Sequence, residues 1–285
     1  MLTRRLGDVQ VSCIGLGGMP LTMDERPSED QAVATLHAAL DAGVTLIDTA
    51  DAYTPSERGP GMNEELIAHA LSTYRGSTQH VIVATKGGHT RDGADWGLNG
   101  RPEYLRSACE ASIRRLSVDS IELYHHHRPD PDVPYEETVG GLLALYEAGL
   151  IKRAGISNAN PHQIRLAHGI LGDALASVQN EFSPTYRSSE PEIGLCEELG
   201  LTFMPWSPLG GMSSAKELGS DRSAFAEVAA AHDVSPQQVA LAWELSLSDY
   251  VIPIPGASRP ASIQSSVAAA DLVLTPAELE RLSAT

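Results

Sequence analysis

Short apolar segments rich in β-branched residues alternate with amphipathic segments along the whole chain. Runs of this length, bounded by turn residues, are typical of buried strands in a parallel sheet, which is covered on both faces. Between them, apolar residues recur at helical spacing and predict helices, including residues 30–42, 62–74, 102–116, 135–149 and 235–247. The predicted strands comprise residues 11–17, 44–50, 80–86, 120–126, 153–158, 177–182, 201–207 and 250–255.

Residues that commonly begin or end helices lie at the borders of these segments. The starts are Ser28, Arg101-Pro102, Asn160-Pro161 and Ser235-Pro236, and the stops are Gly43, Gly149 and Gly200. Parallel strands need a crossover between them, and eight strand–helix units predict an α/β fold closed into a (β/α)8 TIM barrel. Ahead of the barrel, residues 3–9 predict an N-terminal β-hairpin arm. Residues 272–283 predict a short C-terminal helix that opens at Thr275-Pro276.

An open, doubly wound sheet is the structural alternative to the barrel. No G-x-G-x-x-G sequence follows an early strand, as a dinucleotide-binding fold of that kind would require. Low-complexity linkers are also absent from the sequence, so residues 1–285 are predicted to form one domain. With 42% hydrophobic and 20% charged residues, the chain can bury a large core and has no disorder signature.

The excess of acidic over basic residues argues against some classes of binding partner. There are 37 acidic and 20 basic side chains, and the formal net charge is −17. Such a field repels phosphate backbones and anionic lipids, which argues against nucleic-acid and membrane-surface binding. No segment approaches the roughly 20 apolar residues of a membrane span. The first residues do not resemble a signal peptide, and Cys13, Cys109 and Cys196 lack metal-site spacing, so a cytoplasmic protein is expected.

Polar side chains gather where three successive predicted strands end. Asp48 and Tyr53 follow the second strand, Lys86 ends the third, and the segment 125–128, His-His-His-Arg, ends the fourth. Active sites of barrels are built at this end of the strands. Each residue alone has an ordinary explanation as a loop cap, packing group or solvated side chain. Their arrangement at the same end of neighbouring strands is what indicates a site.

These residue types can form a proton-donating device. A phenol has a pKa of about 10 and is a weak acid at neutral pH. A neighbouring ammonium stabilises the phenolate and lowers that pKa, and a carboxylate can hold the ammonium in place. In a strand, successive side chains alternate faces, so His125 and His127 share one direction and His126 takes the other.

Several sequence blocks occur in an order and at a spacing that resemble the aldo-keto reductases. They are DTADAY (48–53), VIVATKGG (81–88), SIRRLSVDSIELYHHHRPDPD (112–132), KRAGISN (152–158), SVQNEFSP (177–184), PWSPLGG (205–211) and VIPIPGASRP (251–260). The resemblance implies a (β/α)8 barrel that binds NAD(P)H in an extended form, which explains the missing glycine motif. The PLGG stretch and the C-terminal part are similar to bacterial members such as pyridoxal reductases.

The resemblance implies a catalytic tetrad of Asp48, Tyr53, Lys86 and His127. The family block Leu-Tyr-x-x-His, counted from Leu123-Tyr124, selects His127 among the three histidines. His125 and His126 are then expected to pack or to donate supporting hydrogen bonds. In the implied reaction, an NAD(P)H hydride reaches a carbonyl carbon, the tyrosine protonates the oxygen, and the histidine orients the carbonyl.

The resemblance also places the nicotinamide. Ser157, Asn158 and Gln179 match positions that hold its carboxamide, and Trp206 matches the aromatic residue that stacks on its ring. The residues that resemble the loop over the pyrophosphate are Ser207, Pro208, Leu209 and Gly210.

At the adenosine end the chain departs from the family pattern. Positions that often carry a Lys-Ser pair and later Arg, Glu and Asn hold Gly256, Ala257, Ser262, Ser265 and Ser266 here. Arg259 is left as the cation for a 2′-phosphate, which it would meet through charge-assisted hydrogen bonds. The implied cofactor is NADPH, with NADH open.

Two other functions compete with a small-molecule carbonyl reductase. His125-x-His127 has ligand-like spacing for a metal-dependent hydrolase, although Lys86 at a neighbouring strand end would oppose a cation. A cofactor-binding sensor or regulatory subunit would share the fold. Trp96, after the third strand, is a candidate for the substrate mouth. The substrate, the oligomeric state and the direction of the reaction are not specified by these patterns.

Overall fold

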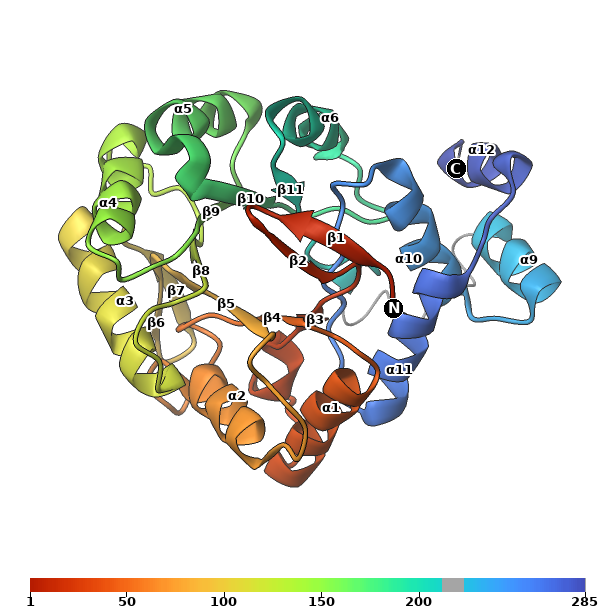
Figure 1. Ribbon diagram of the computed structural model, residues 1–285, viewed down its shortest axis with the longest axis horizontal. Coiled ribbons are helices and arrows are strands. Elements are labelled where there is room, and N and C mark those ends of the chain that lie inside the picture. The colour runs from red at the N-terminus through yellow and green to blue at the C-terminus, as the bar shows by residue number, and fades with distance from the viewer. Residues whose placement is uncertain (212–222, 285) are drawn as a thin grey trace.

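A curled sheet of seven parallel strands forms the centre of the molecule, which we describe from a computed structural model for residues 1–211 and 223–284 (Figure 1). Every neighbouring pair in this sheet is parallel. The strands, in spatial order, are β11 (Thr202–Phe203), β10 (Leu175–Gln179), β9 (Ala154–Ser157), β8 (Leu123–His126), β5 (Ile82–Gly87), β4 (Leu46–Asp48) and β3 (Leu16–Gly17).

The predicted eighth strand, residues 250–255, closes the gap between β11 and β3 but is not a regular strand. On one side, the Ile252 N–H donates to the Phe203 carbonyl at 2.9 Å. On the other, the Gly15 N–H donates to the Pro253 carbonyl at 2.9 Å and the Gly17 N–H to the Pro255 carbonyl at 3.0 Å. Prolines have no N–H, so this segment accepts from β3 without donating back. The sheet therefore closes into the predicted (β/α)8 barrel, although residues 250–255 form only part of the regular hydrogen-bond ladder.

Most helices surround the sheet and bury one face against it, whereas the helices Ser223–His232 and Pro276–Ser283 lie outside this ring and pack on each other and on the helix Pro236–Leu247. Three of them begin with reciprocal capping boxes, Asn160 with Gln163, Ser235 with Gln238 and Thr275 with Glu278. The predicted helices and the C-terminal helix are confirmed with shifts of a few residues at their ends. The helices are α1 (Glu29–Asp41), α2 (Met62–Thr73), α3 (Pro102–Leu116), α4 (Tyr135–Glu147), α5 (Pro161–Leu171), α6 (Glu190–Leu199), α9 (Ser223–His232), α10 (Pro236–Leu247), α11 (Pro260–Ala268) and α12 (Pro276–Ser283).

The predicted N-terminal hairpin covers the amino-terminal end of the barrel (Figure 1). It consists of β1 (Thr3–Leu6) and β2 (Val9–Ser12), and so it extends into the range predicted for the first barrel strand. Residues 11–12 pair with β1 because Leu6 and Val11 bury themselves among the side chains inside the barrel. With this end covered, the carboxyl ends of the strands are the open end.

A second hairpin, which the sequence patterns did not predict, stands at the open end between β5 and α3. Its strands are β6 (His89–Asp92) and β7 (Asp95–Leu98). Trp96 was expected in a loop and instead lies in β7, with the Arg91 guanidinium 4.4 Å from its ring centroid. The hairpin places the aromatic side chains of His89 and Trp96 beside the strand ends that carry the predicted site.

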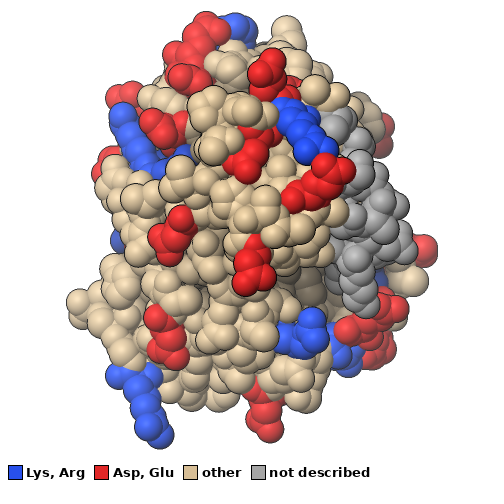
Figure 2. All heavy atoms as spheres, turned by 90° about the vertical axis from the view of Figure 1, so that its right-hand side faces the viewer, with Lys and Arg blue, Asp and Glu red and all other residues tan. Residues whose placement is uncertain are grey.

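The distribution of surface charge and the state of the cysteines agree with the expectations from the sequence. On the face shown in Figure 2, acidic and basic side chains are interspersed, and the coloured residues of that face form no basic patch. Cys13, Cys109 and Cys196 are free and buried. Within the described ranges, no helix is both long and apolar enough to span a membrane.

Candidate active site

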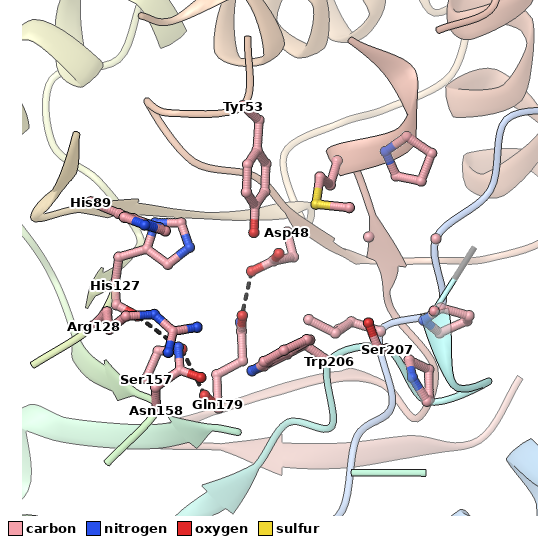
Figure 3. Close-up of a pocket in the computed structure, with 18 of the residues that line it drawn as sticks. Asp48, Tyr53, His89, His127, Arg128, Ser157, Asn158, Gln179, Trp206 and Ser207 are labelled. Atoms are coloured by element: carbon pink, nitrogen blue, oxygen red, sulfur yellow. Dashed lines mark hydrogen bonds between the residues drawn. The ribbon is translucent and has the colours of Figure 1, made fainter. Parts of the chain in front are cut away.

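A pocket of about 350 Å³ opens at the carboxyl ends of the strands (Figure 3). Most of the residues predicted for the site line it, and they come from strand ends that are distant in sequence. These are Asp48, Tyr53, Trp96, His127, Ser157, Asn158, Gln179, Trp206, Ser207, Pro208, Leu209 and Gly256. The lining also includes residues that sequence reasoning did not assign, namely Gly17, Met19, Pro20, His89, Arg128, Gly211, Ile254 and Pro255.

Lys86 is fully buried beneath the pocket and joins the other predicted catalytic groups. Its ammonium donates to Asp48 Oδ2 at 2.6 Å, to the Thr49 carbonyl at 2.8 Å and to the Tyr53 hydroxyl at 3.2 Å. Gln179 Nε2 donates to the other carboxylate oxygen of Asp48 at 2.8 Å. These bonds fix the Tyr53 hydroxyl at the pocket wall.

The barrel register explains why these groups meet. The end of β4, which carries Asp48, pairs with β5 at Ala84, and Lys86 follows two residues later on the same face. Tyr53 lies in the loop after β4, where the Thr22 hydroxyl donates to its carbonyl at 2.9 Å. Side chains from two adjacent strand ends and one buried loop therefore converge without a backbone distortion.

The protonation states suit proton donation from Tyr53. Burial is the largest single effect on the pKa of Lys86 and lowers it, but the charges and hydrogen bonds of Asp48 and Tyr53 together outweigh burial. The net pKa is raised, so the ammonium stays charged. Burial raises the pKa of Tyr53, Lys86 lowers it, and the balance leaves it above the ordinary value. Sequence reasoning considered only the effect of Lys86, and the enclosure of the ring reverses the net direction. The phenol is thus protonated at neutral pH.

His127 faces the same pocket as a neutral imidazole. Burial, reinforced by the charge on Lys86, holds its pKa well below 6.5. Its ring lies edge-on to the Tyr53 ring with 5.6 Å between centroids, and its Nδ1 has no hydrogen-bond partner within the described residues. A neutral imidazole beside the phenol can donate one hydrogen bond to an oxygen in the pocket.

The other two histidines of the run lie elsewhere. His125 Nε2 lies 2.9 Å from Ser177 Oγ inside the barrel, where Gly155 leaves room for the ring. His126 lies outside the sheet, with its ring 6.0 Å from the Tyr135 ring. The alternation of strand side chains accounts for this separation.

Polar groups on the opposite wall could hold a nicotinamide carboxamide. Ser157 Oγ donates to the Gln179 carbonyl at 2.7 Å, and Asn158 Nδ2 donates to the His127 carbonyl at 3.0 Å. In the described part of the chain, Asn158 Oδ1 and Gln179 Oε1 accept no hydrogen bond, so both acceptors are available to a ligand. Asn158 has a φ of +57°, a left-handed conformation that Asn tolerates better than most residues.

The rest of this wall is a cradle that side chains would fill. A Cβ on Gly17 would lie 2.7 Å from the Ile254 carbonyl oxygen, and one on Gly256 would lie 2.8 Å from Pro20 Cγ. Trp206 lies along the pocket with its Nε1 buried and unpartnered among the described residues. Figure 3 shows Trp206 across the cavity from Tyr53. The wall therefore offers a flat indole beside two glycines, where a ligand can approach the backbone closely.

Three predicted residues lie outside the lining. Lys86 is behind it, and Gly210 is adjacent to it, between Leu209 and Gly211, which both line the pocket. Arg259 is exposed at the start of α11, three residues beyond Gly256. Its assignment to a 2′-phosphate stays a prediction.

Two of the unassigned lining residues have side chains that can ionise, and they were missed for different reasons. Arg128 directly follows His127, and only its ordinary solvated role was considered. His89 lies in β6, whose hairpin has no periodic signal in the sequence. Among the described residues, no group of three or more His, Cys, Asp or Glu side chains is arranged to hold a metal ion. The metal-dependent hydrolase therefore gains no support.

The comparison with known proteins agrees with this geometry. The aldo/keto reductase family model matches residues 13–285. A Glycine max protein, "Probable aldo-keto reductase 1", is 34% identical over 302 residues, which cover 96% of this chain and 85% of the soybean protein. An uncharacterized oxidoreductase of Schizosaccharomyces pombe is 35% identical over 278 residues, covering 96% of this chain and 86% of its own.

Solved structures show the same fold. An aldo-keto reductase of Klebsiella pneumoniae in complex with NADPH has a TM-score of 0.82 and 28% identity, covering 100% of this chain and 95% of that chain. Another from the same organism, in complex with NADP and acetate, has a TM-score of 0.81 and 28% identity, covering 99% and 94%.

Proposed function

Because the chain belongs to the aldo/keto reductase family, we propose that it reduces aldehyde or ketone carbonyls with NADPH and uses Tyr53 as the proton donor. The observation that carries this proposal is the bonding of Lys86, which donates to both Asp48 and the Tyr53 hydroxyl. A buried ammonium is costly to desolvate and must be fully paired, and here one of its three partners is the Tyr53 hydroxyl at the pocket wall.

The pocket can bind a carbonyl oxygen between Tyr53 and His127. The neutral imidazole donates a hydrogen bond that orients the oxygen, and the phenol donates the proton as negative charge develops there. Lys86 then stabilises the phenolate that remains, and Asp48 keeps Lys86 in place. These four side chains are buried, and the low polarity of their surroundings strengthens each of these electrostatic interactions.

The cofactor would lie along the opposite wall. A bound NADPH supplies the hydride for the carbonyl carbon. Asn158 and Gln179 would hold the carboxamide, Trp206 would stack on the nicotinamide ring, and Ser207 to Gly210 would pass over the pyrophosphate. The preference for NADPH over NADH rests on Arg259 and on the NADP complexes of the Klebsiella proteins.

A panel of aldehydes and ketones, including pyridoxal, tests the proposal by the loss of NADPH absorbance. We expect turnover of at least one carbonyl, and Tyr53→Phe should lower kcat by about 100-fold to 10,000-fold, the usual contribution of a general acid. The variant should bind NADPH with nearly unchanged affinity, measured by cofactor fluorescence. Full activity of Tyr53→Phe would refute the assignment. Tight NADPH binding without oxidation by any carbonyl would favour a sensor instead.

The cofactor preference is tested in the same assay. We expect kcat/KM to be higher with NADPH than with NADH, and Arg259→Ala to reduce that ratio. An unchanged ratio in the variant would remove Arg259 from the cofactor site.

A further inference from the structure

The pocket carries a positive charge that the catalytic groups do not balance. Asp48, which lines the cavity, is neutralised by the buried Lys86 at 2.6 Å. The two imidazoles that line it are uncharged at neutral pH, because burial lowers the pKa of His127 well below 6.5 and that of His89 to about 4. Among the described lining residues, Arg128, which is exposed at the pocket, is then the only charged side chain without an ion-pair partner.

Arg128 has no carboxylate within ion-pair distance in the described ranges of the chain. Glu181 lies near enough for Arg128 to lower its pKa, but burial of Glu181 has the larger effect and leaves that pKa raised. Figure 3 shows the guanidinium directed into the pocket beside His127 and Asn158. A ligand that displaces water from this guanidinium must return an acceptor, or the desolvation cost is not recovered.

Aromatic rings form the wall between the catalytic groups and the mouth. His89 lies 4.9 Å edge-on from His127, and its other side faces Trp96 with 4.6 Å between centroids at an angle of 36°. Trp96 is 42% exposed, yet Arg91 fixes it from behind at 4.4 Å. Arg91 itself is held by Asp24 at 3.6 Å. An exposed tryptophan held in this way offers a flat surface to a ligand ring.

We propose that the substrate is an aromatic aldehyde or ketone that carries a carboxylate. Its carbonyl lies between Tyr53 and His127, its ring packs against His89 and Trp96, and Arg128 binds the carboxylate. A guanidinium matches a carboxylate with two parallel hydrogen bonds, which gives direction as well as charge. This inference rests on the proposed carbonyl reduction and adds the substrate class to it.

Two aldehydes that differ mainly in charge test the role of Arg128. We expect kcat/KM with NADPH to be higher for 4-carboxybenzaldehyde than for its neutral analogue, methyl 4-formylbenzoate. Arg128→Gln should reduce that ratio by about 10-fold to 100-fold, as for a lost hydrogen bond to a charged group. Arg75→Gln, an equal change of charge at an exposed position after α2, should leave the ratio unchanged. A ratio that Arg128→Gln does not alter would overturn the role of Arg128.

Two aldehydes of equal charge test the ring surface. We expect Trp96→Ala to lower kcat/KM for 4-carboxybenzaldehyde more than for succinic semialdehyde, which has a carboxylate but no ring. Tyr146→Ala, which removes an exposed ring from α4, is the matched control. Equal losses for both aldehydes in Trp96→Ala would overturn the aromatic part of the proposal.

A binding measurement separates this inference from the proposed reaction. Calorimetry with the NADP⁺-loaded protein should show benzoate binding more tightly than benzamide, and Arg128→Gln should abolish the difference. If no carbonyl is reduced but benzoate still binds through Arg128, the reductase proposal fails and the anion site stands. If carbonyls are reduced but benzoate and benzamide bind alike, the anion site fails and the reductase proposal stands.

Discussion

Lys86 and Glu244 are both ionisable side chains with no solvent exposure, and their surroundings are opposite. Lys86 donates three hydrogen bonds at the end of β5, and its raised pKa keeps it charged through attraction to Asp48. Glu244 lies in α10, and neither of its carboxylate oxygens has a partner among the described residues. Burial alone raises its pKa well above 4.5, so it is held neutral. Burial retains a charge only where a partner of opposite charge is buried with it.

The functional consequence follows from this difference. Lys86 is buried and charged because it serves Tyr53, whereas no acceptor, cation or pocket in the described structure uses Glu244. We therefore interpret the burial of Lys86 as a loss of stability that is retained because the charge serves Tyr53. The burial of Glu244 also lowers stability, but Glu244 has no role in the pocket. The following changes test that comparison.

Removing the ammonium should have the largest effect. Lys86→Met leaves Asp48 as a buried carboxylate without its cation, and we expect the free energy of unfolding to fall by about 3–5 kcal/mol. Urea unfolding measures this loss, and kcat should fall by about 100-fold or more because the phenolate loses its cation. The double variant Lys86→Met/Asp48→Asn should recover much of the stability but none of the activity. Recovery of activity as well would contradict the role of Lys86 at Tyr53.

Replacing Glu244 should act in the opposite direction. Glu244→Met fills the same space with an apolar chain, and we expect the free energy of unfolding at pH 7 to rise by about 1–4 kcal/mol. Thermal or urea unfolding measures the gain, with kcat as the control, because Glu244 does not line the pocket. A loss of stability in Glu244→Met would show that the carboxyl has a partner after all.

The gain from Glu244→Met should depend on pH. The native pKa of Glu244 lies above its unfolded value, so native protein retains a proton that the unfolded chain releases. The contribution of Glu244 to the stability of the wild type therefore falls as pH rises above about 4.5, at up to about 1.4 kcal/mol per pH unit until the native pKa is reached. The gain should be smallest near pH 4 and grow toward pH 7. Glu244→Gln does not titrate at this position, so its stability should lack this slope.

A surface ion pair should show the smallest effect. Arg165 and Glu198 pair at 3.0 Å with both side chains more than half exposed. Solvent screens such a pair, and we expect Arg165→Ala to leave the thermal midpoint unchanged within error. A clear drop in the thermal midpoint would mean that an exposed ion pair also stabilises this protein, and it would contradict the importance that we assign to burial.

Much of the candidate site could be predicted because it lies on regular strands. Asp48, Lys86 and His127 each stand at or beside a strand end, and parallel strands bring their carboxyl ends to the same end of the barrel. His127 was separated from its neighbours by the family spacing and by the alternation of strand side chains. The fold could be predicted for the same reason, since hydrophobic periodicity is a local property of the chain.

Other features could not be predicted because they depend on long-range packing. The strands β6 and β7 are short and pair with each other, and their residues do not alternate between apolar and polar. Residues 11–12 belong to the N-terminal hairpin rather than to the first barrel strand, because Val11 is buried where the hairpin covers the amino-terminal end of the barrel. In residues 250–255, two prolines limit the ladder between β11 and β3.

The sequence by itself determined the alternation of strands and helices, the end of the barrel that carries the chemistry, and the four residue types placed there. Those properties follow from periodicity and from the order of elements. Only the tertiary structure decided how far each group is removed from water. Enclosure raises the pKa of Tyr53 against the pull of Lys86 and holds Glu244 neutral, whereas Arg128 stays exposed at the pocket without an ion-pair partner among the described residues. Desolvation depends on all surrounding atoms at once, and no local pattern in the chain specifies it.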